Sequence, residues 1–400
     1  MLKCVIYPCE QNMRHYLRII ILLAFSSFCL GVAEFIVSGI LTQLSLYYGV
    51  SDSQVGNLAT LYALGVVVGA PIVSVLISSF NYRNQLIFTL GLFSLSNAIM
   101  FMSSSLWVAL VARFIGGLMH GLFFVIATII SIKVAPKSKT TMALSLMVSG
   151  LTIALVTGVP IGILVSKHYG LLAPFLLIAC VSCLVALCAL FIMPKLSSKQ
   201  ANFKNLWVAF GFAPVWQGFL VTAFSCGSMF VVYIYLRMLL EQHGFSPVSI
   251  ANAYLFFGIA AIVGNLFGGK LADLRGFFAS LSFLLTMQIL ALSAMSFSYY
   301  LPKWVLIANV MGFGFFGFAC IAPLKMLCNH LARIFTPHTQ NDTIALNEAS
   351  FNVGITFASL AGGLVAHLNV NFNGLCAALF ALSALSILSF GIKKASFHVK

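Results

Sequence analysis

The chain has 400 residues, of which 61% are hydrophobic and only 7% are charged, and its mean hydropathy is +1.07. Soluble domains carry roughly 25% charged residues, so this composition excludes a soluble protein. The net charge of +14 comes from 21 Lys and Arg against 7 Asp and Glu. In a soluble protein it would suggest nucleic acid as a partner. Here the bases lie in short loops between apolar runs, so we expect no nucleic-acid binding.

Twelve apolar runs are long enough to cross a bilayer, which takes about 20 helical residues. They cover residues 17–41, 54–78, 85–103, 106–132, 141–166, 171–193, 207–240, 248–272, 277–298, 303–325, 340–366 and 372–392. The sequence therefore predicts an all-α membrane protein. We expect the first turns of the seventh run, up to Pro214, to lie at the interface. The first run follows two possible start residues, Met1 and Met13, and is expected to be a span rather than a cleaved signal.

The basic residues fix the expected orientation of the spans. If loops alternate between the two sides, 17 of the 21 bases share the side of both termini. They are Lys3, Arg14, Arg18, Arg83, Lys133, Lys137, Lys139, Lys195, Lys199, Lys204, Lys270, Arg275, Lys325, Arg333, Lys393, Lys394 and Lys400. The opposite side has Lys167, Arg237 and Lys303, and Arg113 is inside a span. Because basic loops stay in the cytoplasm, we expect both termini there.

An internal repeat divides the chain into two halves. Gly65-x-x-x-Gly69 recurs as Gly264-x-x-x-Gly268, and a second small-residue stripe, at 150–162, recurs at 354–362. Small residues four apart let neighbouring helices approach closely. We predict an N-terminal six-helix bundle at 1–194, a cytoplasmic linker at 195–206 and a C-terminal bundle at 207–400. Such parallel repeats are a recurring plan of transporters.

Glu34 is the charged residue that most needs an explanation, because no other charged residue lies between Arg18 and Asp52. An ionisable group at bilayer depth costs roughly 2.5–3.5 kcal/mol on insertion scales and marks a functional site by default. We therefore predict that Glu34 binds a proton or contacts a cation in a central cavity. The alternative is a protonated carboxyl that only joins two helices by a hydrogen bond.

Arg113 is the expected partner of Glu34, since both residues fall in the outer half of their spans at similar depth. The alternative is that Arg113 binds only backbone carbonyls or a polar neighbour. His120 is two turns further along the same helix and could belong to a proton relay or be a hydrogen-bonded core histidine. Glu348 and Asn352, in the eleventh span, are predicted to line the inner mouth of the pathway, or Glu348 to reach the interface.

Other motifs limit the chemistry. Gly158-Val-Pro160-Ile-Gly162 interrupts the fifth span, because proline removes a backbone hydrogen bond, and fits either a moving interface or a static kink. There is no P-loop, so ATP is not an expected energy source. The pair Cys180-x-x-Cys183 has no second cysteine pair and no nearby histidine, which argues against a metal site. We expect no metal, no cofactor and no enzymatic activity.

Several of these segments resemble the major facilitator superfamily over nearly the whole chain. Gly269-Lys-Leu-Ala-Asp273-Leu-Arg275-Gly276 is similar to its loop signature, in which the acid and bases latch neighbouring helices on the cytoplasmic side. The base expected directly after the acid is replaced by Leu274, and Arg275 is the candidate substitute. In the first half Ser78 stands in the acidic position and only Arg83 keeps the basic character.

Two further motifs and one narrower likeness suggest what the transporter does. Arg113 with Gly117 and Gly121 resembles the fourth-helix motif linked to proton coupling. Gly150 through Gly162, with Pro160, resembles the fifth-helix motif of antiporters. Together with the first-span motif Gly31–Phe35 and Gly69-Ala-Pro71, these segments look like the branch of arabinose-efflux-permease-like and drug:proton antiporters.

The resemblance implies two pseudo-symmetric six-helix halves and alternating access. The expected function is proton-driven export of a small organic solute, such as a sugar or a drug, across the bacterial inner membrane by a monomer. The expected partners are the solute, protons and membrane lipid. An importer, symporter or facilitator on the same fold is the main alternative, and a non-transporting sensor or scaffold is a further one.

Overall fold

The computed structural model describes residues 9–198, 200–297 and 302–392, which are helices and their connections. The first-half helices are α1 (Cys9–Gly39), α2 (Leu41–Tyr48), α3 (Asp52–Val68), α4 (Ser74–Leu76), α5 (Tyr82–Met102), α6 (Leu106–Val134), α7 (Thr140–Tyr169) and α8 (Ala173–Ile192). The second-half helices are α9 (Phe203–Val208), α10 (Ala213–Gln242), α11 (Pro247–Arg275), α12 (Phe277–Ser296), α13 (Lys303–Ala319), α14 (Ile321–Phe335), α15 (Gln340–Leu368) and α16 (Asn373–Ser386). Short π- and 3₁₀-helical turns complete them, including η1 (Gly69–Val73), η3 (Ala209–Gly211) and η6 (Ile387–Ile392).

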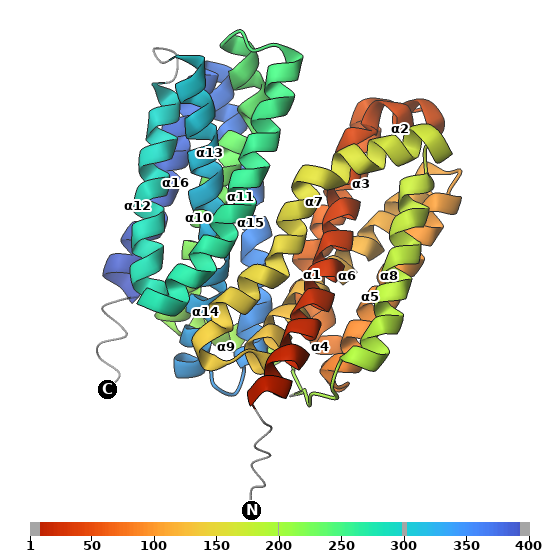
Figure 1. Cartoon of the computed structure of the whole chain (residues 1–400), viewed down its shortest axis with the longest axis vertical. Helices are drawn as coiled ribbons and strands as arrows, with labels where there is room; N and C mark the ends of the chain where they lie inside the picture. Colours follow the sequence, from red (N-terminus) through yellow and green to blue (C-terminus); the bar gives the residue numbers. More distant parts are fainter. Residues whose placement is uncertain (1–8, 199, 298–301, 393–400) are drawn as a thin grey trace, which may run out of the picture.

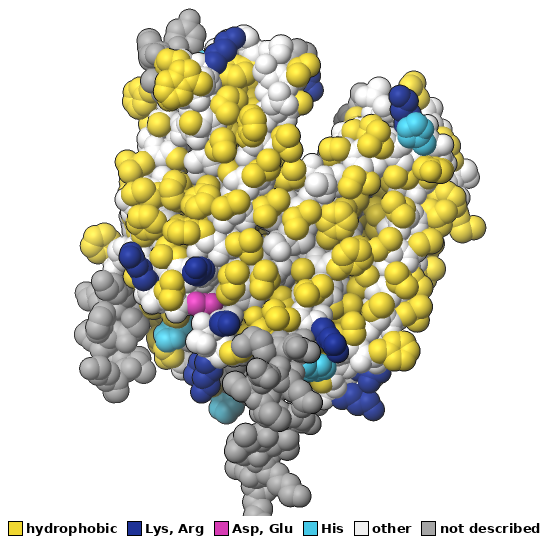
Figure 2. All heavy atoms as spheres, in the orientation of Figure 1, with side chains coloured by type: hydrophobic (Ala, Val, Ile, Leu, Met, Phe, Trp, Pro, Cys, Tyr) yellow, Lys and Arg dark blue, Asp and Glu magenta, His cyan; other side chains and the backbone are white. Residues whose placement is uncertain are grey.

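The described residues contain twelve helical stretches long and apolar enough to span a membrane, as predicted. The surface agrees with this: Figure 2 shows hydrophobic side chains over most of the middle of one face, with Lys and Arg gathered toward its two ends. The start of the seventh predicted run is separate, because α9 and η3 precede α10. That break near Pro214 fits the expected interfacial turns.

The tenth span corrects one prediction. It runs from Lys303 to Phe335 through α13 and α14, so it continues ten residues beyond Lys325. Lys325 was predicted to be a loop base, but it is buried, with its side chain only 3% exposed. The prediction ended the span at this charge, although apolar residues continue beyond it up to Phe335. Without Lys325, 16 of the 17 bases remain on the side of the termini against three on the opposite side, so the excess of bases remains.

The glycine stripes explain which helices pair. A Cβ added at Gly150 of α7 would lie 1.8 Å from the carbonyl oxygen of Ala24 in α1. In the second half a Cβ at Gly354 of α15 would lie 2.2 Å from the carbonyl oxygen of Ala223 in α10. Helix pairs α1–α7 and α10–α15 thus pack backbone to backbone at corresponding positions, as small-residue stripes permit.

A second set of glycines repeats this relation. A Cβ at Gly69, next to α3, would lie 2.2 Å from the carbonyl oxygen of Leu118 in α6. A Cβ at Gly268 of α11 would lie 1.9 Å from the carbonyl oxygen of Ala319 in α13. The pairs α3–α6 and α11–α13 therefore correspond, which agrees with the repeat in the sequence.

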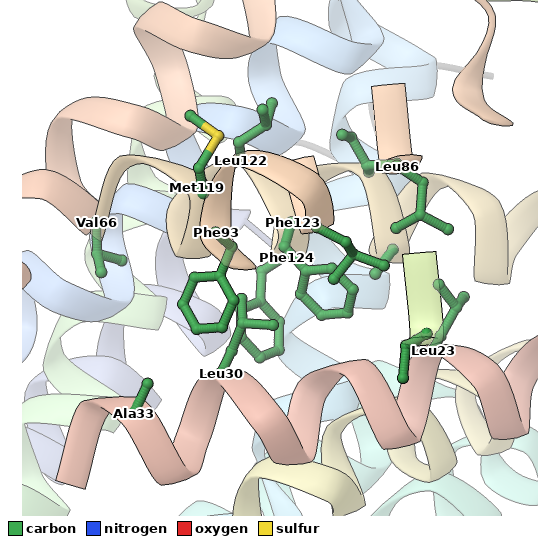
Figure 3. Close-up of a cluster of buried hydrophobic side chains, with 14 of the residues drawn as sticks. Leu23, Leu30, Ala33, Val66, Leu86, Phe93, Met119, Leu122, Phe123 and Phe124 are labelled. Atoms are coloured by element: carbon green, nitrogen blue, oxygen red, sulfur yellow. The ribbon is translucent and has the colours of Figure 1, made fainter. Parts of the chain in front are cut away.

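Between these close helices, each half has its own apolar core. In the first half Leu23 and Leu30 of α1 meet Phe93 of α5 and Phe123 of α6, and all four side chains are buried (Figure 3). The second half has separate buried clusters, one of them around Phe257 and Phe313. These cores hold the helices of each half together and leave the space between the halves for a cavity.

The two halves meet at one end of the molecule and diverge at the other (Figure 1). The start of α1 and the end of η6 lie at the end where the halves meet, which we call the termini face. Figure 2 shows the surface hollowed between the halves at the opposite face. Contacts between the halves are made mainly by α7 with α11, and by α15 with α3 and α6.

Candidate transport cavity

A cavity of about 300 Å³ lies between the two halves and is lined from both. Its wall is mostly aliphatic and aromatic, with Phe35 and Phe124 from the first half and Phe230, Tyr233 and Phe351 from the second. Polar side chains are few: Glu34, His120, Cys226, Lys325, Glu348 and Asn352. Four of the five residues predicted for the cavity therefore line it, and the fifth, Arg113, lies outside this lining.

Glu34 reaches the cavity from α1, and its side chain is 25% exposed. Its carboxylate Oε2 lies 3.9 Å from Nε2 of His120 on α6, which is beyond direct hydrogen-bond length. The other ring nitrogen of His120, Nδ1, lies 2.8 Å from the hydroxyl of Tyr62 on α3. His120 is therefore a hydrogen-bonded core residue that also lies near the carboxylate, and its part in a proton relay stays a prediction.

Arg113 lies behind this group and does not share the cavity with Glu34 as predicted. Its guanidinium lies 4.0 Å from the ring centroid of Tyr62, and Nη1 and Nε donate to the carbonyls of Ala33 (2.7 Å) and Leu58 (3.2 Å). Within the described residues, the base within 4 Å of Glu34 is His120. The helix rotation, which span depth alone cannot predict, places Arg113 against the Tyr62 ring and two backbone carbonyls.

The bond to Ala33 nevertheless keeps the positive charge near the acid. Ala33 is the residue before Glu34, so the guanidinium contacts the backbone from which the carboxylate extends. Arginine stays charged at any relevant pH, and in a buried site its field is only weakly screened. Arg113 therefore places a positive charge near Glu34 without forming an ion pair with it.

A second charged group lines the cavity on the other half. Lys325 of α14 forms an ion pair with Glu348 of α15, and both side chains are buried, 3% and 6% exposed. The hydroxyl of Thr128, on α6 of the first half, donates to Oε1 of Glu348 (3.0 Å) and lies 3.3 Å from Nζ of Lys325. We call these three residues the floor cluster.

Sequence reasoning missed Lys325, Thr128 and Tyr62. Thr128 and Tyr62 are uncharged polar residues in apolar runs, and nothing in their spacing distinguishes them. Lys325 had a usable signal: the residues after it, up to Phe335, continue apolar apart from Asn329, His330 and Arg333. A lysine within a long apolar stretch requires a buried anion, and the following span contains two acids, Asp342 and Glu348.

The antiporter-like motif faces its own half. Cβ atoms at Gly158 and Gly162 would lie 2.9 Å and 1.9 Å from side-chain atoms of Val32 and Ile36 in α1. Helix α7 continues through Pro160, whose side chain is exposed. These residues therefore pack α7 against α1, rather than forming the moving interface between halves that was one of two interpretations.

The opposite face of α7 forms a polar seam with α11 of the second half. Ser145 Oγ donates to the carbonyl of Asn265 (2.8 Å), and the Asn265 amide donates to the carbonyl of Ser145 (2.7 Å). One turn further along α11, a Cβ at Gly269 would lie 2.1 Å from Ser145 Oγ. Both Ser145 and Asn265 are fully buried, so this seam joins the halves on the termini side.

Asp273 completes the seam at the termini face. Its two carboxylate oxygens accept from the backbone N–H groups of Thr141 (2.9 Å) and Met142 (2.8 Å), in the first turn of α7. A carboxylate at a helix N-terminus satisfies free donors and interacts favourably with the helix dipole. Gly276 ends α11 with φ +79°, a conformation that favours glycine. Arg275, in the last turn, is exposed.

The corresponding region of the first half is hydrogen-bonded to the linker at 195–206. Ser78 Oγ accepts from the backbone N–H of Ala201 (2.9 Å), and Lys133 Nζ donates to the carbonyl of Ser197 (3.0 Å). Arg83 donates to the carbonyl of Leu190. Asn341 of α15 donates to the hydroxyl of Tyr82 (2.8 Å), which is the link to the second half here.

The described residues contain no cluster of three or more His, Cys, Asp or Glu side chains that could hold a metal ion. Cys180 and Cys183 are exposed and unpaired.

The sequence profile of the Major Facilitator Superfamily matches residues 23–332. The uncharacterised MFS-type transporter YtbD of Bacillus subtilis is 31% identical over 346 residues, covering 86% of this chain and 87% of its own. The putative transporter AraJ of Escherichia coli is 29% identical over 381 residues, covering 93% and 94%. A probable sugar efflux transporter of Helicobacter acinonychis is 26% identical over 366 residues, covering 90% and 91%.

Two solved structures share the fold. The Escherichia coli fucose:proton symporter FucP, in an outward conformation, superposes with a TM-score of 0.77 at 16% identity, covering 94% of this chain and 99% of its own. The proton:xylose symporter XylE gives a TM-score of 0.75 at 14% identity, covering 95% and 96%. At such identities these likenesses concern the fold alone.

Proposed function

The chain belongs to the major facilitator superfamily, whose members are secondary transporters, and on that premise we propose that it exports a small organic solute in exchange for protons. The observation that carries the proposal is Glu34, a carboxylate in a cavity between the two halves, 3.9 Å from His120. Intramembrane acids that face a cavity are typical proton sites. In this account Glu34 binds the transported proton.

The neighbours of Glu34 have separate roles in this mechanism. The 2.8 Å contact between His120 Nδ1 and the Tyr62 hydroxyl fixes the His120 ring beside Glu34. Arg113, bonded to the Ala33 carbonyl, favours release of the proton because it stabilises the ionised carboxylate. Helix α7 seals the termini side through its seam with α11 and must separate from α11 when the protein opens there.

Export is favoured over import by sequence motifs. The segments Gly31–Phe35 and Gly158–Gly162 resemble those of exporters, and one relative is named a probable sugar efflux transporter. The alternative is import by symport, since FucP and XylE are named as proton symporters. We further propose a monomer in the bacterial inner membrane with both termini in the cytoplasm, where the excess of bases would lie.

The cavity lining favours an apolar solute with few polar groups over a free sugar. A buried hydroxyl without a hydrogen-bond partner costs about 1–3 kcal/mol, and a sugar carries several. Lys325 and Glu348 bind each other, which leaves Glu34 and Asn352 as the main groups for a solute, among aromatic walls. A ring-bearing solute with one cationic or donor group fits this lining.

The direction of coupling tests the proposal. A stabilisation screen of the purified protein over sugars, nucleosides and cationic drugs would first supply a ligand. That ligand would then be loaded into proteoliposomes, and an inward proton gradient imposed. We expect the gradient to drive the solute out of the vesicles. Filling of the vesicles would establish symport, and no response to the gradient would establish a facilitator.

A further inference from the structure

The floor cluster is a buried charged group that the proposed proton site does not use. Lys325 and Glu348 come from adjacent helices of the second half, and both are almost fully buried. Removing a pair of charges from water is unfavourable unless further hydrogen bonds satisfy them. Here such a bond comes from Thr128, which belongs to the other half. The best-satisfied state of the pair therefore requires the two halves to be together.

The position of the cluster identifies the side that it closes. Along α6, Thr128 follows His120 by eight residues, or about 12 Å at 1.5 Å per residue. Helix α6 runs toward the termini face, where α7 begins beside Asp273. The cluster thus lies between the Glu34–His120 group and the termini face, at the floor of the cavity.

Additional contacts across the halves involve the same lysine. Nζ of Lys325 lies 5.4 Å from the ring centroid of Phe124, one turn before Thr128 on α6, and 5.2 Å from that of Phe351 on α15. A cation near an aromatic face is stabilised by the ring. Lys325 therefore contacts both halves, through a hydroxyl and a ring of α6 and through its own ion pair.

We propose that Lys325 is a positioning residue for transport, which holds the Glu348 carboxylate in place for its hydrogen bond with Thr128 and so closes the cavity on the termini side. Opening toward that side separates α6 from α14 and α15 and removes the Thr128 bond from the pair. The ion pair itself stays within the second half. The proposal concerns alternating access alone, so it holds whatever the coupling ion or direction of transport.

The test uses Thr128→Val, which removes the hydroxyl, keeps the shape and leaves the ion pair in place. Spin labels attached through unnatural amino acids, with the native cysteines retained, would report distances between the halves. Asn84 and Arg333 are exposed near the termini face, and Ser105 and Asn252 are exposed toward the opposite face. Distances would be measured without solute or gradient, so the result is independent of the proposed proton coupling.

We expect Thr128→Val to raise the ratio of open to closed molecules at the termini face about tenfold, equivalent to 1.4 kcal/mol. The Asn84–Arg333 distances should gain a longer population, and the Ser105–Asn252 distances a shorter one. Thr128→Ser should behave as the parent protein. The matched control is Thr152→Val, a buried threonine whose hydroxyl bonds only its own helix, at the Ser149 carbonyl (3.0 Å). Equal distance distributions for Thr128→Val and Thr152→Val would overturn the proposal.

A second pair of variants tests the lysine itself. Lys325→Met leaves a buried carboxylate without its counter-charge, and should populate the open state or lower the yield of folded protein. Adding Glu348→Gln removes that charge while keeping an acceptor for Thr128. The double variant should return to within about threefold of the parent ratio, since a neutral pair restores the bond across the halves. If the double variant stays as open as Lys325→Met, Lys325 does not act through Glu348.

Discussion

At the scale of single residues, Glu34 illustrates how the protein accommodates a carboxylate at bilayer depth. The cost of roughly 2.5–3.5 kcal/mol for a charge there is offset by two features of its surroundings. The side chain is partly exposed to the cavity, and Arg113 lies beside the preceding residue. Neither feature places a base in direct contact with the carboxylate, which leaves Glu34 accessible to a proton.

Tyr62→Phe tests the link from His120 to Tyr62. The substitution keeps the ring over Arg113 but removes the hydroxyl 2.8 Å from Nδ1 of His120. We expect the free energy of unfolding to fall by about 0.6–1.7 kcal/mol, the range for hydrogen bonds in membranes. Proton-driven transport should fall as well, because His120 is no longer fixed beside Glu34. Thermal unfolding and transport in vesicles measure the two effects.

Tyr48→Phe is the matched control for that experiment. Tyr48 makes an equivalent side-chain bond, 2.9 Å to Ser103 Oγ, on a part of the first half that does not line the cavity. It should lose similar stability and keep its transport activity. Normal coupling in Tyr62→Phe, or an equal loss of coupling in both variants, would remove Tyr62 from the mechanism.

The sequence predicted the charged residues of the cavity better than their contacts. Glu34 and Arg113 stand out because a charge in an apolar run is rare, and their depth follows from counting residues. Depth does not give helix rotation, so the contact of Arg113 with the Tyr62 ring could not be predicted. Lys325 was misplaced because a hydropathy run was ended at its charge, and its neutralising partner is 23 residues away.

At the scale of helices, close glycine contacts determine the pairing, and α1 with α7 is the clearest case. We expect Gly150→Ala to destabilise the protein by about 1–3 kcal/mol, since overpacking forces the helices apart and the new methyl would lie 1.8 Å from a backbone oxygen. Gly91→Ala is the control, because open space surrounds that position on α5 and alanine favours the helix. Equal melting temperatures for the two variants would contradict this account of the pairing.

The capping of α7 by Asp273 leads to a local prediction. Asp273→Asn keeps the size but loses the charge that interacts with the helix N-terminus, worth about 1–2 kcal/mol in a partly buried position. Amide exchange at Thr141 and Met142 should accelerate by about 5- to 30-fold. The N-terminus of α11, capped within its own helix by Ser246, should be unchanged. Unaltered exchange at the start of α7 would show that the carboxylate does not hold this seam closed.

The helices themselves were largely predictable, because length and hydropathy mark a span and glycine stripes at equal offsets mark the repeat. The neighbour that each helix face contacts was less predictable. The stripe from Gly150 to Gly162 faces α1 within one half, whereas Ser145 and Asn265, ordinary polar residues in the sequence, join the two halves. A stripe of small residues indicates close packing but does not identify the neighbouring helix.

At the scale of the whole molecule, the few acids are concentrated where the halves meet. Of seven acidic residues, Glu34 and Glu348 line the cavity and Asp273 bonds the halves at the termini face. The two halves share one helix arrangement but differ in these groups: in the first half, the family resemblance expects an acid at Ser78. The arrangement therefore separates the proposed proton site at Glu34 from the contacts that join the halves at the termini face.

The most direct test of proton-coupled export compares Glu34→Gln with the parent protein in proteoliposomes loaded with the solute. Under an inward proton gradient, the parent should expel solute against its concentration gradient. Glu34→Gln should reach the membrane and bind the solute but show no gradient-driven efflux. Glu241→Gln, an exposed acid paired with Arg237, is the control and should behave as the parent. Normal coupled efflux by Glu34→Gln would contradict the assignment of Glu34 as the proton site.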